Sequence, residues 1–219
     1  INEASLRKLV KINIDRGVDG FYVGGSTGEA FLLGPEERKR ILEVVMDEVA
    51  GRVAVISHIG AIGTDLTIDL GKHAQALGVD AISSIPPFYY KFSADEIVGY
   101  YHDIADAVQV PLIPYNFPAL SGVTLSGDLM RRLRKHAGII GVKFTSNDLF
   151  QLEQMKADDH ELLVYNGFDE IYLAGLTMGA DGAIGSAFNF MPEQYIGLEK
   201  HVMAGNMDAA RKHQGEGNA

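Results

Sequence analysis

Short apolar runs alternate with amphipathic stretches along the whole chain. Seven of these runs are short and either β-branched or otherwise apolar, which is typical of buried β-strands. The expected strands are Gly20–Gly25, Val53–Gly60, Ala81–Pro86, Pro111–Asn116, Ile139–Thr145, Leu162–Phe168 and Gly182–Ala187. The helical stretches between them include Glu36–Val49, Asp65–Leu77 and Ala94–Ala107, and a further helix, Ser5–Arg16, opens the chain.

The alternation of strands and helices predicts a fold. Strands that are apolar throughout and are joined by crossover helices indicate a parallel sheet buried on both faces. The unit recurs regularly without a linker, so we expect one (β/α)8 barrel domain over 1–219 rather than a doubly wound sheet. A closed barrel needs an eighth strand. We therefore expect the barrel to be incomplete at both ends, with a strand missing before Ile1 and an interrupted helix at Gly215–Ala219.

Composition narrows the class of protein. Of the 219 residues, 47% are hydrophobic, which supports a sizeable core, and the net charge of -10 disfavours binding to nucleic acid or to an anionic membrane. The chain has no cysteine, which excludes disulfides and thiolate chemistry. The uncharged run Ala107–Gly127 contains three prolines that would break a membrane-spanning helix. We expect a cytoplasmic protein.

Lys143 is the sharpest chemical feature of the sequence. In the strand IIGVKFT, alternation places Gly141, Lys143 and Thr145 on one face and the apolar residues on the other, so Lys143 should point into the barrel. An unpaired ammonium is disfavoured there, which lowers the pKa and makes the neutral amine available to attack a ketone. The alternative is a structural lysine that is paired with a buried carboxylate or reaches solvent at a strand end.

Tyr115 ends the strand before that of Lys143. The carboxyl ends of barrel strands face the catalytic mouth, so the two side chains should lie together. A phenol beside a Schiff base can carry a proton to or from a substrate hydroxyl. The alternative is an aromatic side chain that only fills space.

Gly24–Glu29 (GGSTGE) follows a strand directly. Its glycines allow close approach of a ligand, and its amides and hydroxyls form a small nest suited to a carboxylate. The same letters satisfy G-x-S-x-G, the serine hydrolase pattern, although Ala30–Gly34 separates Ser26 from the next helix, where a nucleophile elbow would enter it directly. A plain glycine turn is the simplest alternative.

Two further stretches follow the last strands. Tyr165–Glu170 offers Asp169 and Glu170 as acceptors for a polyhydroxylated substrate, and Gly182–Ser186 is a glycine-rich turn of the kind that binds anions in barrels. A solvated loop and a tight turn are the alternatives. No histidine lies near the two carboxylates, so no metal site is expected. The scattered histidines are interpreted as structural or surface residues: His58, His73, His102, His136 and His160.

Five ordered segments together resemble the dihydrodipicolinate synthase family of pyruvate-dependent aldolases, and its sialic acid-cleaving branch in particular. They are GGSTGEAF at 24–31, PYNFPALSG at 114–122, GVKFTS at 141–146, YNGFDE at 165–170 and GADGAIGS at 179–186. The resemblance runs in register over essentially the whole chain. It implies a Schiff-base aldolase that reversibly cleaves N-acetylneuraminate to N-acetylmannosamine and pyruvate, without a metal or organic cofactor.

The resemblance also implies roles for individual residues. Lys143 would form the Schiff base, Tyr115 would be the proton shuttle, and Ser26 with Thr27 would hold the pyruvoyl carboxylate. Tyr89 would cross a subunit interface to complete a hydroxyl relay through Ser26, which implies a homotetramer. The residues implied for the sugar are Thr145, Gly167, Asp169, Glu170 and Ser186.

The resemblance separates two branches of the family. Dihydrodipicolinate synthases carry an arginine in the loop after the catalytic tyrosine, where this chain has Leu120. Asp169 and Glu170 suit a hydroxyl-rich sugar. Phe168 stands where some lyases have tyrosine, which leaves the shape of the sugar pocket open. The remaining alternatives are an aldolase for another 2-keto-3-deoxy sugar acid, a dihydrodipicolinate synthase and, more distantly, a serine hydrolase using Ser26.

Overall fold

The computed structural model describes residues 1–219 and contains one curled sheet of seven parallel strands. The strands pair in chain order, each with the next. Their bounds are β1 Gly20–Val23, β2 Ala54–His58, β3 Ala81–Ser84, β4 Leu112–Asn116, β5 Gly141–Phe144, β6 Leu163–Asn166 and β7 Gly182–Ala183. The predicted set of seven parallel strands is therefore confirmed.

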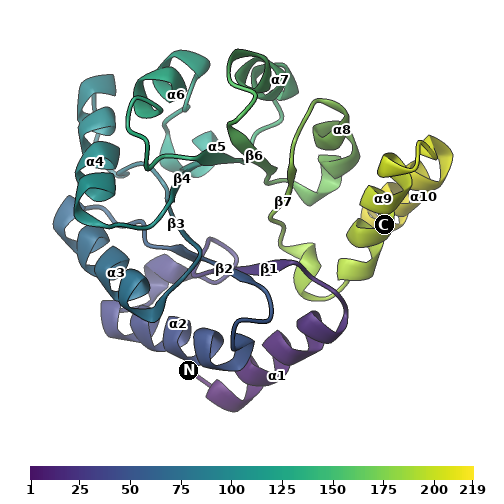
Figure 1. Ribbon diagram of the computed structural model, residues 1–219, viewed down its shortest axis with the longest axis horizontal. Coiled ribbons are helices and arrows are strands. Elements are labelled where there is room, and N and C mark those ends of the chain that lie inside the picture. The colour runs from purple at the N-terminus through teal and green to yellow at the C-terminus, as the bar shows by residue number, and fades with distance from the viewer.

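The helices lie outside the curled sheet and surround it (Figure 1). They are α1 Glu3–Asp15, α2 Pro35–Val49, α3 Thr64–Leu77, α4 Ala94–Ala107, α5 Pro118–Ser121, α6 Gly127–Leu133, α7 Leu149–Asp158, α8 Tyr172–Thr177, α9 Pro192–Met203 and α10 Met207–Gly217. Three short 3₁₀ turns complete the structure: η1 Ala30–Leu32, η2 Asp169–Ile171 and η3 Ala187–Asn189. None of the helices is both long and apolar enough to cross a lipid bilayer.

The observed elements differ from the predicted ones mainly in the residues at which they begin and end. The last strand was expected at Gly182–Ala187 but ends at Ala183, so Ser186 lies in a turn before η3. Small and apolar residues continue past Ala183, where the backbone pairing of β7 ends, so composition alone does not show where this strand ends. The first helix begins at Glu3, earlier than Ser5, because the Asn2 side chain accepts a hydrogen bond from the Ser5 amide and caps it.

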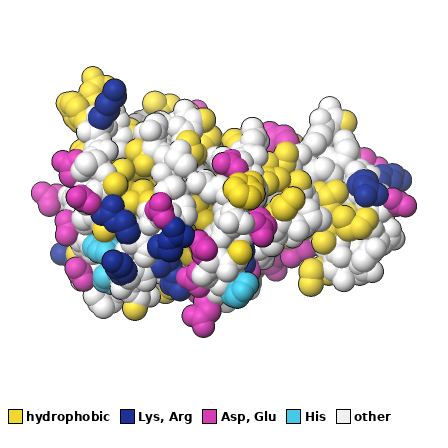
Figure 2. Space-filling view, turned by 90° about the horizontal axis from the view of Figure 1, so that it is seen from above, with side chains coloured by type: hydrophobic (Ala, Val, Ile, Leu, Met, Phe, Trp, Pro, Cys, Tyr) yellow, Lys and Arg dark blue, Asp and Glu magenta, His cyan; other side chains and the backbone are white.

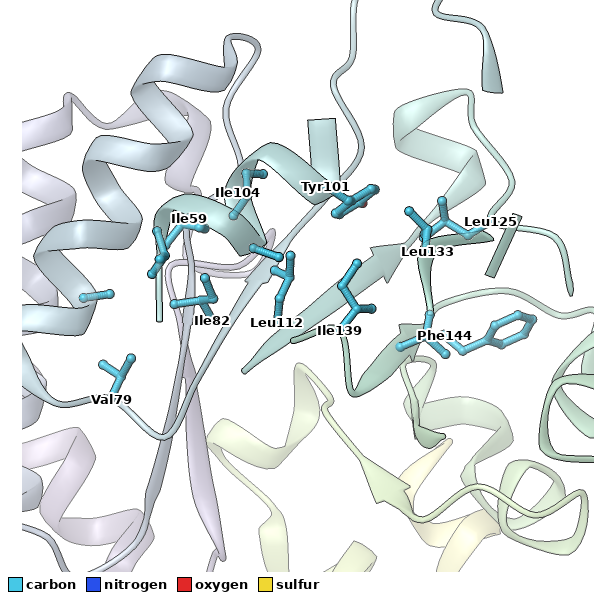
Figure 3. Packing of buried hydrophobic residues seen from close by; sticks show 14 of the residues in the cluster. Ile59, Val79, Ile82, Tyr101, Ile104, Leu112, Leu125, Leu133, Ile139 and Phe144 are labelled. Atoms are coloured by element: carbon cyan, nitrogen blue, oxygen red, sulfur yellow. The ribbon is translucent and has the colours of Figure 1, made fainter. Parts of the chain in front are cut away.

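The main hydrophobic core lies between the sheet and the helices. It contains 30 buried residues, among them Ile82, Leu112 and Phe144 (Figure 3). Strand alternation divides each strand between this core and the inside of the sheet: in β5, Val142 and Phe144 join the core and Lys143 faces inward. The packing of apolar residues between the sheet and the helices thus determines which side chains point to the inner face of the sheet.

The sheet is open between β1 and β7, because no pairing joins these two strands (Figure 1). One more strand at this position would close an eight-stranded barrel, so the architecture is that of a (β/α)8 barrel lacking one strand. A strand before Ile1 stays a prediction.

On the face drawn in Figure 2, acidic and basic side chains are interspersed and neither sign forms a large separate patch.

Candidate active site

Lys143 lies at the centre of the site, on the inner face of the sheet. Backbone pairing aligns it with Tyr115 on β4 and with Tyr165 on β6. Its Nζ atom lies 4.1 Å from the centroid of the Tyr115 ring and 4.3 Å from that of Tyr22 on β1. Only 7% of the residue is exposed. The predicted inward orientation beside Tyr115 is confirmed.

The surroundings of Lys143 weaken its charged form. Burial lowers the pKa of the Lys143 ammonium from 10.5 to about 7, and the negative charge of Asp169 acts in the opposite direction. Lys143 forms no ion pair with any carboxylate, so the interpretation as a structural salt-bridged lysine does not hold. The rings of Tyr22 and Tyr115 provide only cation–π contacts to the protonated form. A substantial fraction of Lys143 is therefore a neutral amine near neutral pH.

Tyr115 places its hydroxyl in the same space. Burial raises the pKa of the Tyr115 phenol, and the nearby Ser26 hydroxyl acts in the opposite direction. The Thr145 hydroxyl is itself buried and has no hydrogen-bond partner. Buried polar atoms are rarely left without a partner, so Thr145 has a free donor and acceptor to offer a bound molecule.

The loop Gly24–Glu29 lies between β1 and η1, beside Lys143. It turns sharply, with φ of 73° at Gly24 and 54° at Glu29. The Gly28 amide donates to the Gly25 carbonyl and the Glu29 amide to the Ser26 carbonyl, both at 3.0 Å, whereas the amides of Ser26 and Thr27 donate to no protein group. The turn thus carries the two free amides and two hydroxyls from which the sequence predicts an anion site, and binding of an anion there stays a prediction.

Asp169 and its surroundings form a second wall, which adjoins this loop. One carboxylate oxygen of Asp169 accepts a hydrogen bond of 2.7 Å from the Ala187 amide, and the other, Oδ1, is buried without a partner. Close packing here requires glycine: a Cβ atom at Gly185 would lie 1.7 Å from Asp169 Oδ1, and one at Gly167 would lie 1.8 Å from Thr145 Oγ1. The Ser186 hydroxyl closes the wall, 2.5 Å from the Thr27 hydroxyl.

These residues line one cavity of about 570 Å³. It brings together nine of the ten site residues predicted from the sequence: Ser26, Thr27, Tyr115, Lys143, Thr145, Gly167, Asp169, Glu170 and Ser186. Tyr89 does not line it. Tyr89 lies in the loop after β3, is 82% exposed and has a φ of 78°, with its ring against that of Tyr90. No group of three or more His, Asp or Glu side chains is arranged to hold a metal ion.

The sequence patterns missed two aromatic residues at the site, Tyr22 and Phe117, and the contact between Phe117 and Phe168. Tyr22 lies two residues before Gly24, and its inward orientation follows from the same alternation that identifies Lys143. Its hydroxyl donates to Ser83 Oγ, which donates to the Ile113 carbonyl. Phe117 and Phe168 meet edge to face, 5.9 Å apart, in the loops after β4 and β6 and form an apolar wall of the cavity. Their contact could not be read from positions so far apart in the sequence.

The serine hydrolase alternative finds no support in the geometry. Ser26 is followed by turns and by η1, and the next helix begins only at Pro35. His58, the histidine that bonds to this loop, has both ring nitrogens engaged with the backbone atoms of Gly24 and Ile85. A serine nucleophile needs a base within hydrogen-bond reach, and no histidine with a free nitrogen is provided here.

Comparison with known proteins agrees with this geometry. The family model described as the dihydrodipicolinate synthetase family matches residues 1–218. The chain is 44% identical to an N-acetylneuraminate lyase of Escherichia coli over 219 residues, which is 100% of this chain and 74% of that protein.

Solved structures give the same result. CdNal from Clostridium difficile, solved in complex with mannosamine, superposes with a TM-score of 0.98 and 41% identity over 100% of this chain and 76% of that one. Wild-type sialic acid aldolase from Ruminococcus gnavus superposes with a TM-score of 0.97 and 37% identity over 100% of this chain and 73% of that one. A catalytic lysine mutant of the same aldolase also superposes. The chain belongs to the dihydrodipicolinate synthetase family.

Proposed function

We propose that this chain is a Schiff-base aldolase that reversibly cleaves N-acetylneuraminate to N-acetylmannosamine and pyruvate. The observation that carries the proposal is the unpaired, buried amine of Lys143, with a pKa of about 7, at the centre of a cavity with an anion nest on one wall and a carboxylate on the other. The likeness to N-acetylneuraminate lyases and sialic acid aldolases supports the choice of substrate.

Lys143 is the covalent catalyst in this mechanism. Its neutral amine adds to the C2 ketone of the open-chain sugar acid, and loss of water gives an iminium. The bond between C3 and C4 then breaks, and its electron pair moves toward the iminium nitrogen to give an enamine. Protonation of the enamine at C3 and hydrolysis release pyruvate and restore the amine. The Ruminococcus gnavus aldolase also has a lysine described as catalytic.

Tyr115 moves the proton. The C4 hydroxyl must lose a proton as the C3–C4 bond breaks, and the Tyr115 phenol is placed beside Lys143 for that transfer. The high pKa of Tyr115 requires a path by which the proton can leave, and the Ser26 hydroxyl begins such a relay. Tyr89 from a neighbouring subunit completes it in our proposal.

The two ends of the substrate occupy different walls of the cavity. The amides and hydroxyls of Ser26 and Thr27 bind the pyruvoyl carboxylate. The hydroxyl-rich end faces the unpaired Oδ1 of Asp169, the exposed Glu170 carboxylate and the free Thr145 hydroxyl. Gly167 leaves the space that the Thr145 hydroxyl occupies, and Ser186 links the two walls through Thr27.

The assembly is part of the same proposal. Tyr89 is an exposed aromatic residue with a left-handed backbone, a conformation that bulky residues adopt rarely and chiefly where it serves a function. Contact with a second copy would bury Tyr89 and bring it to that copy's hydroxyl relay. We propose a cytoplasmic homotetramer that uses neither a metal nor an organic cofactor.

A borohydride trap tests the covalent step. Reduction in the presence of pyruvate should add one reduced pyruvyl group to the protein, and peptide mapping should place it on Lys143. Lys143→Ala should abolish labelling, whereas Lys72→Ala, which removes an exposed lysine on α3, should label as the unaltered protein does. Failure of pyruvate to form a reducible adduct on Lys143 would falsify the mechanism.

A substrate comparison tests the choice of sugar. Leu120, where dihydrodipicolinate synthases carry arginine, is 62% exposed and offers no charge for a second carboxylate. N-acetylneuraminate should therefore be cleaved with a higher kcat/KM than 2-keto-3-deoxygluconate, and pyruvate with aspartate semialdehyde should give no condensation product. Faster turnover of 2-keto-3-deoxygluconate would establish the aldolase for another sugar acid instead. Labelling of Ser26 by a fluorophosphonate would support the distant hydrolase alternative.

A further inference from the structure

His58 is a buried titratable residue that the mechanism above does not use. It ends β2, only 3% of it is exposed, and its side chain points into the sheet. The imidazole packs against the rings of Tyr22 and Tyr115, with both centroids 5.9 Å away. The same tyrosine rings flank the Lys143 amine, so His58 lies directly behind the catalytic group.

The two ring nitrogens of His58 connect two loops of the site. The Ile85 amide donates to Nε2 at 3.3 Å, and Nδ1 lies 2.8 Å from the Gly24 carbonyl oxygen. A backbone amide can only donate and a carbonyl can only accept, so Nε2 is unprotonated and Nδ1 carries the proton. His58 is thereby held in one tautomer that ties the loop after β1 to the loop after β3.

Gly24 is the point at which the anion nest leaves β1. Its φ of 73° turns the chain so that Ser26 and Thr27 follow within three residues. No other side chain bonds to the Gly24 carbonyl. The orientation of the Ser26 and Thr27 amides therefore depends on a turn whose first peptide group is held from the side by His58 Nδ1.

We propose that His58 is a positioning residue for the carboxylate nest: its Nδ1–H group holds the Gly24 carbonyl so that the amides of Ser26 and Thr27 meet the substrate carboxylate. The inference rests on the proposed function. It assigns His58 no contact with substrate and no proton transfer. Loss of the bond should weaken binding of the carboxylate and leave the reactivity of Lys143 intact.

Burial and the nearby charges keep the His58 ring neutral over the working pH range. Burial, together with the positive charges of Arg38 and Lys143, lowers the pKa of the His58 imidazole to about 3, against the hydrogen bond to Gly24, which raises it. Arg38 donates to the carbonyl oxygens of His58 and Gly60 at 3.0 and 2.9 Å and fixes the end of β2. A neutral imidazole keeps accepting from Ile85, which a doubly protonated ring could not do.

The imidazole of His58 packs so closely against Gly60 that only glycine fits at position 60. A Cβ atom at Gly60 would lie 2.8 Å from His58 Nε2 and 3.0 Å from the Ile85 amide nitrogen. Gly60→Ala therefore displaces the imidazole without removing it. This substitution provides a second perturbation that is independent of any change at His58.

The simplest alternative is that His58 only fills space. Two polar substitutions at His58 distinguish this packing role from the positioning role. Asparagine carries an amide nitrogen at about the position of Nδ1, whereas glutamine extends its amide toward the position of Nε2. Under our proposal His58→Asn keeps the bond to Gly24 and His58→Gln loses it. Under simple space filling the larger glutamine is at least as good as asparagine.

The experiment measures borohydride trapping of Lys143 with two ketones, pyruvate and hydroxyacetone, which lacks a carboxylate. For His58→Gln and Gly60→Ala we expect the pyruvate concentration for half-maximal trapping to rise about fivefold to tenfold, the size expected for one lost hydrogen bond. Trapping by hydroxyacetone should change less than about twofold, and His58→Asn should stay within about threefold of the unaltered protein for both ketones, because the hydrogen bond to Gly24 is kept.

The outcomes are distinguishable. Equal loss of trapping with both ketones, or a glutamine variant that binds pyruvate as well as the asparagine variant does, overturns the role of His58. Thermal unfolding of each variant identifies any that is not folded. If a His58 variant does not fold, the two ketones are compared in Gly60→Ala instead. If the unaltered protein itself traps no pyruvate, the proposed function fails and not this inference alone.

Discussion

Lys143 and Tyr115 lie on directly paired strands, and the Lys143 Nζ atom is 4.1 Å from the centroid of the Tyr115 ring. The pairing sets this proximity, because residues opposite each other on neighbouring parallel strands point to the same side of the sheet. The amine that is to hold the substrate and the phenol that is to move its proton thus have a fixed separation. The first prediction separates these two roles.

Tyr115→Phe should remove proton transfer and leave Schiff-base formation intact. We expect kcat for cleavage of N-acetylneuraminate to fall by about 10² to 10⁴, the usual contribution of a positioned acid or base. Borohydride trapping with pyruvate should persist, since Lys143 keeps its burial. Loss of trapping in this variant, with normal thermal unfolding, would instead make Tyr115 necessary for adduct formation.

The rate of adduct formation should depend on the protonation of Lys143. Burial places its pKa at about 7, so the neutral fraction, and with it the initial rate of trapping by pyruvate and cyanoborohydride, should rise as pH increases through about 7. Asp169 raises this pKa through its negative charge, so Asp169→Asn should move the rise to lower pH. Asparagine still offers an oxygen to the Ala187 amide. A rise that stays in place or moves to higher pH would contradict the assignment.

Lys143→Met should stabilise the protein while abolishing activity. The folded protein holds Lys143 at a pKa of about 7 against 10.5 when unfolded, so between these values the unfolded state binds more protons. Stability should therefore rise with pH from about 7 toward 10 in the unaltered protein, and this part of the slope should vanish in the variant. Denaturant unfolding at pH 7 and pH 9 measures it. The gain at pH 7 should be on the order of a few kcal/mol, since one pKa unit is worth about 1.4 kcal/mol. An equal pH slope in both proteins would show that Lys143 is not buried as an unpaired amine.

Gly185→Ala should impair the sugar wall selectively. The added Cβ would lie 1.7 Å from Asp169 Oδ1, so the carboxylate must move. We expect kcat/KM for N-acetylneuraminate to fall at least tenfold, on the order of one to two kcal/mol for a displaced polar group, while trapping of Lys143 by pyruvate is retained.

The matched control for this variant is Gly182→Ala. Its Cβ would meet the Tyr165 ring at 3.6 Å, an ordinary contact, so activity should change little. Equal effects of the two substitutions would show that small residues are needed here for packing in general and not to accommodate Asp169.

The succession of strands and helices, the inward face of β5 and the inward orientation of Lys143 were determined by the sequence alone. Their physical basis is local: side chains alternate along a strand, and apolar residues on one face must join the core. The motifs also predicted an anion nest at Ser26–Thr27, because glycines and hydroxyl residues that directly follow a strand can be recognised from consecutive positions. These features follow from neighbours in the chain.

Only the tertiary structure decided how the site is completed. The pKa of Lys143 depends on the burial that several strands produce together, and on Asp169, which lies at the start of η2, the third element after β5. The sequence placed His58 among structural or surface histidines, and only the structure shows that its buried ring bonds to Gly24, 34 positions earlier. Burial, charge and hydrogen bonding act between atoms that are close in space, so the curling of the sheet has to be known before they can be assigned.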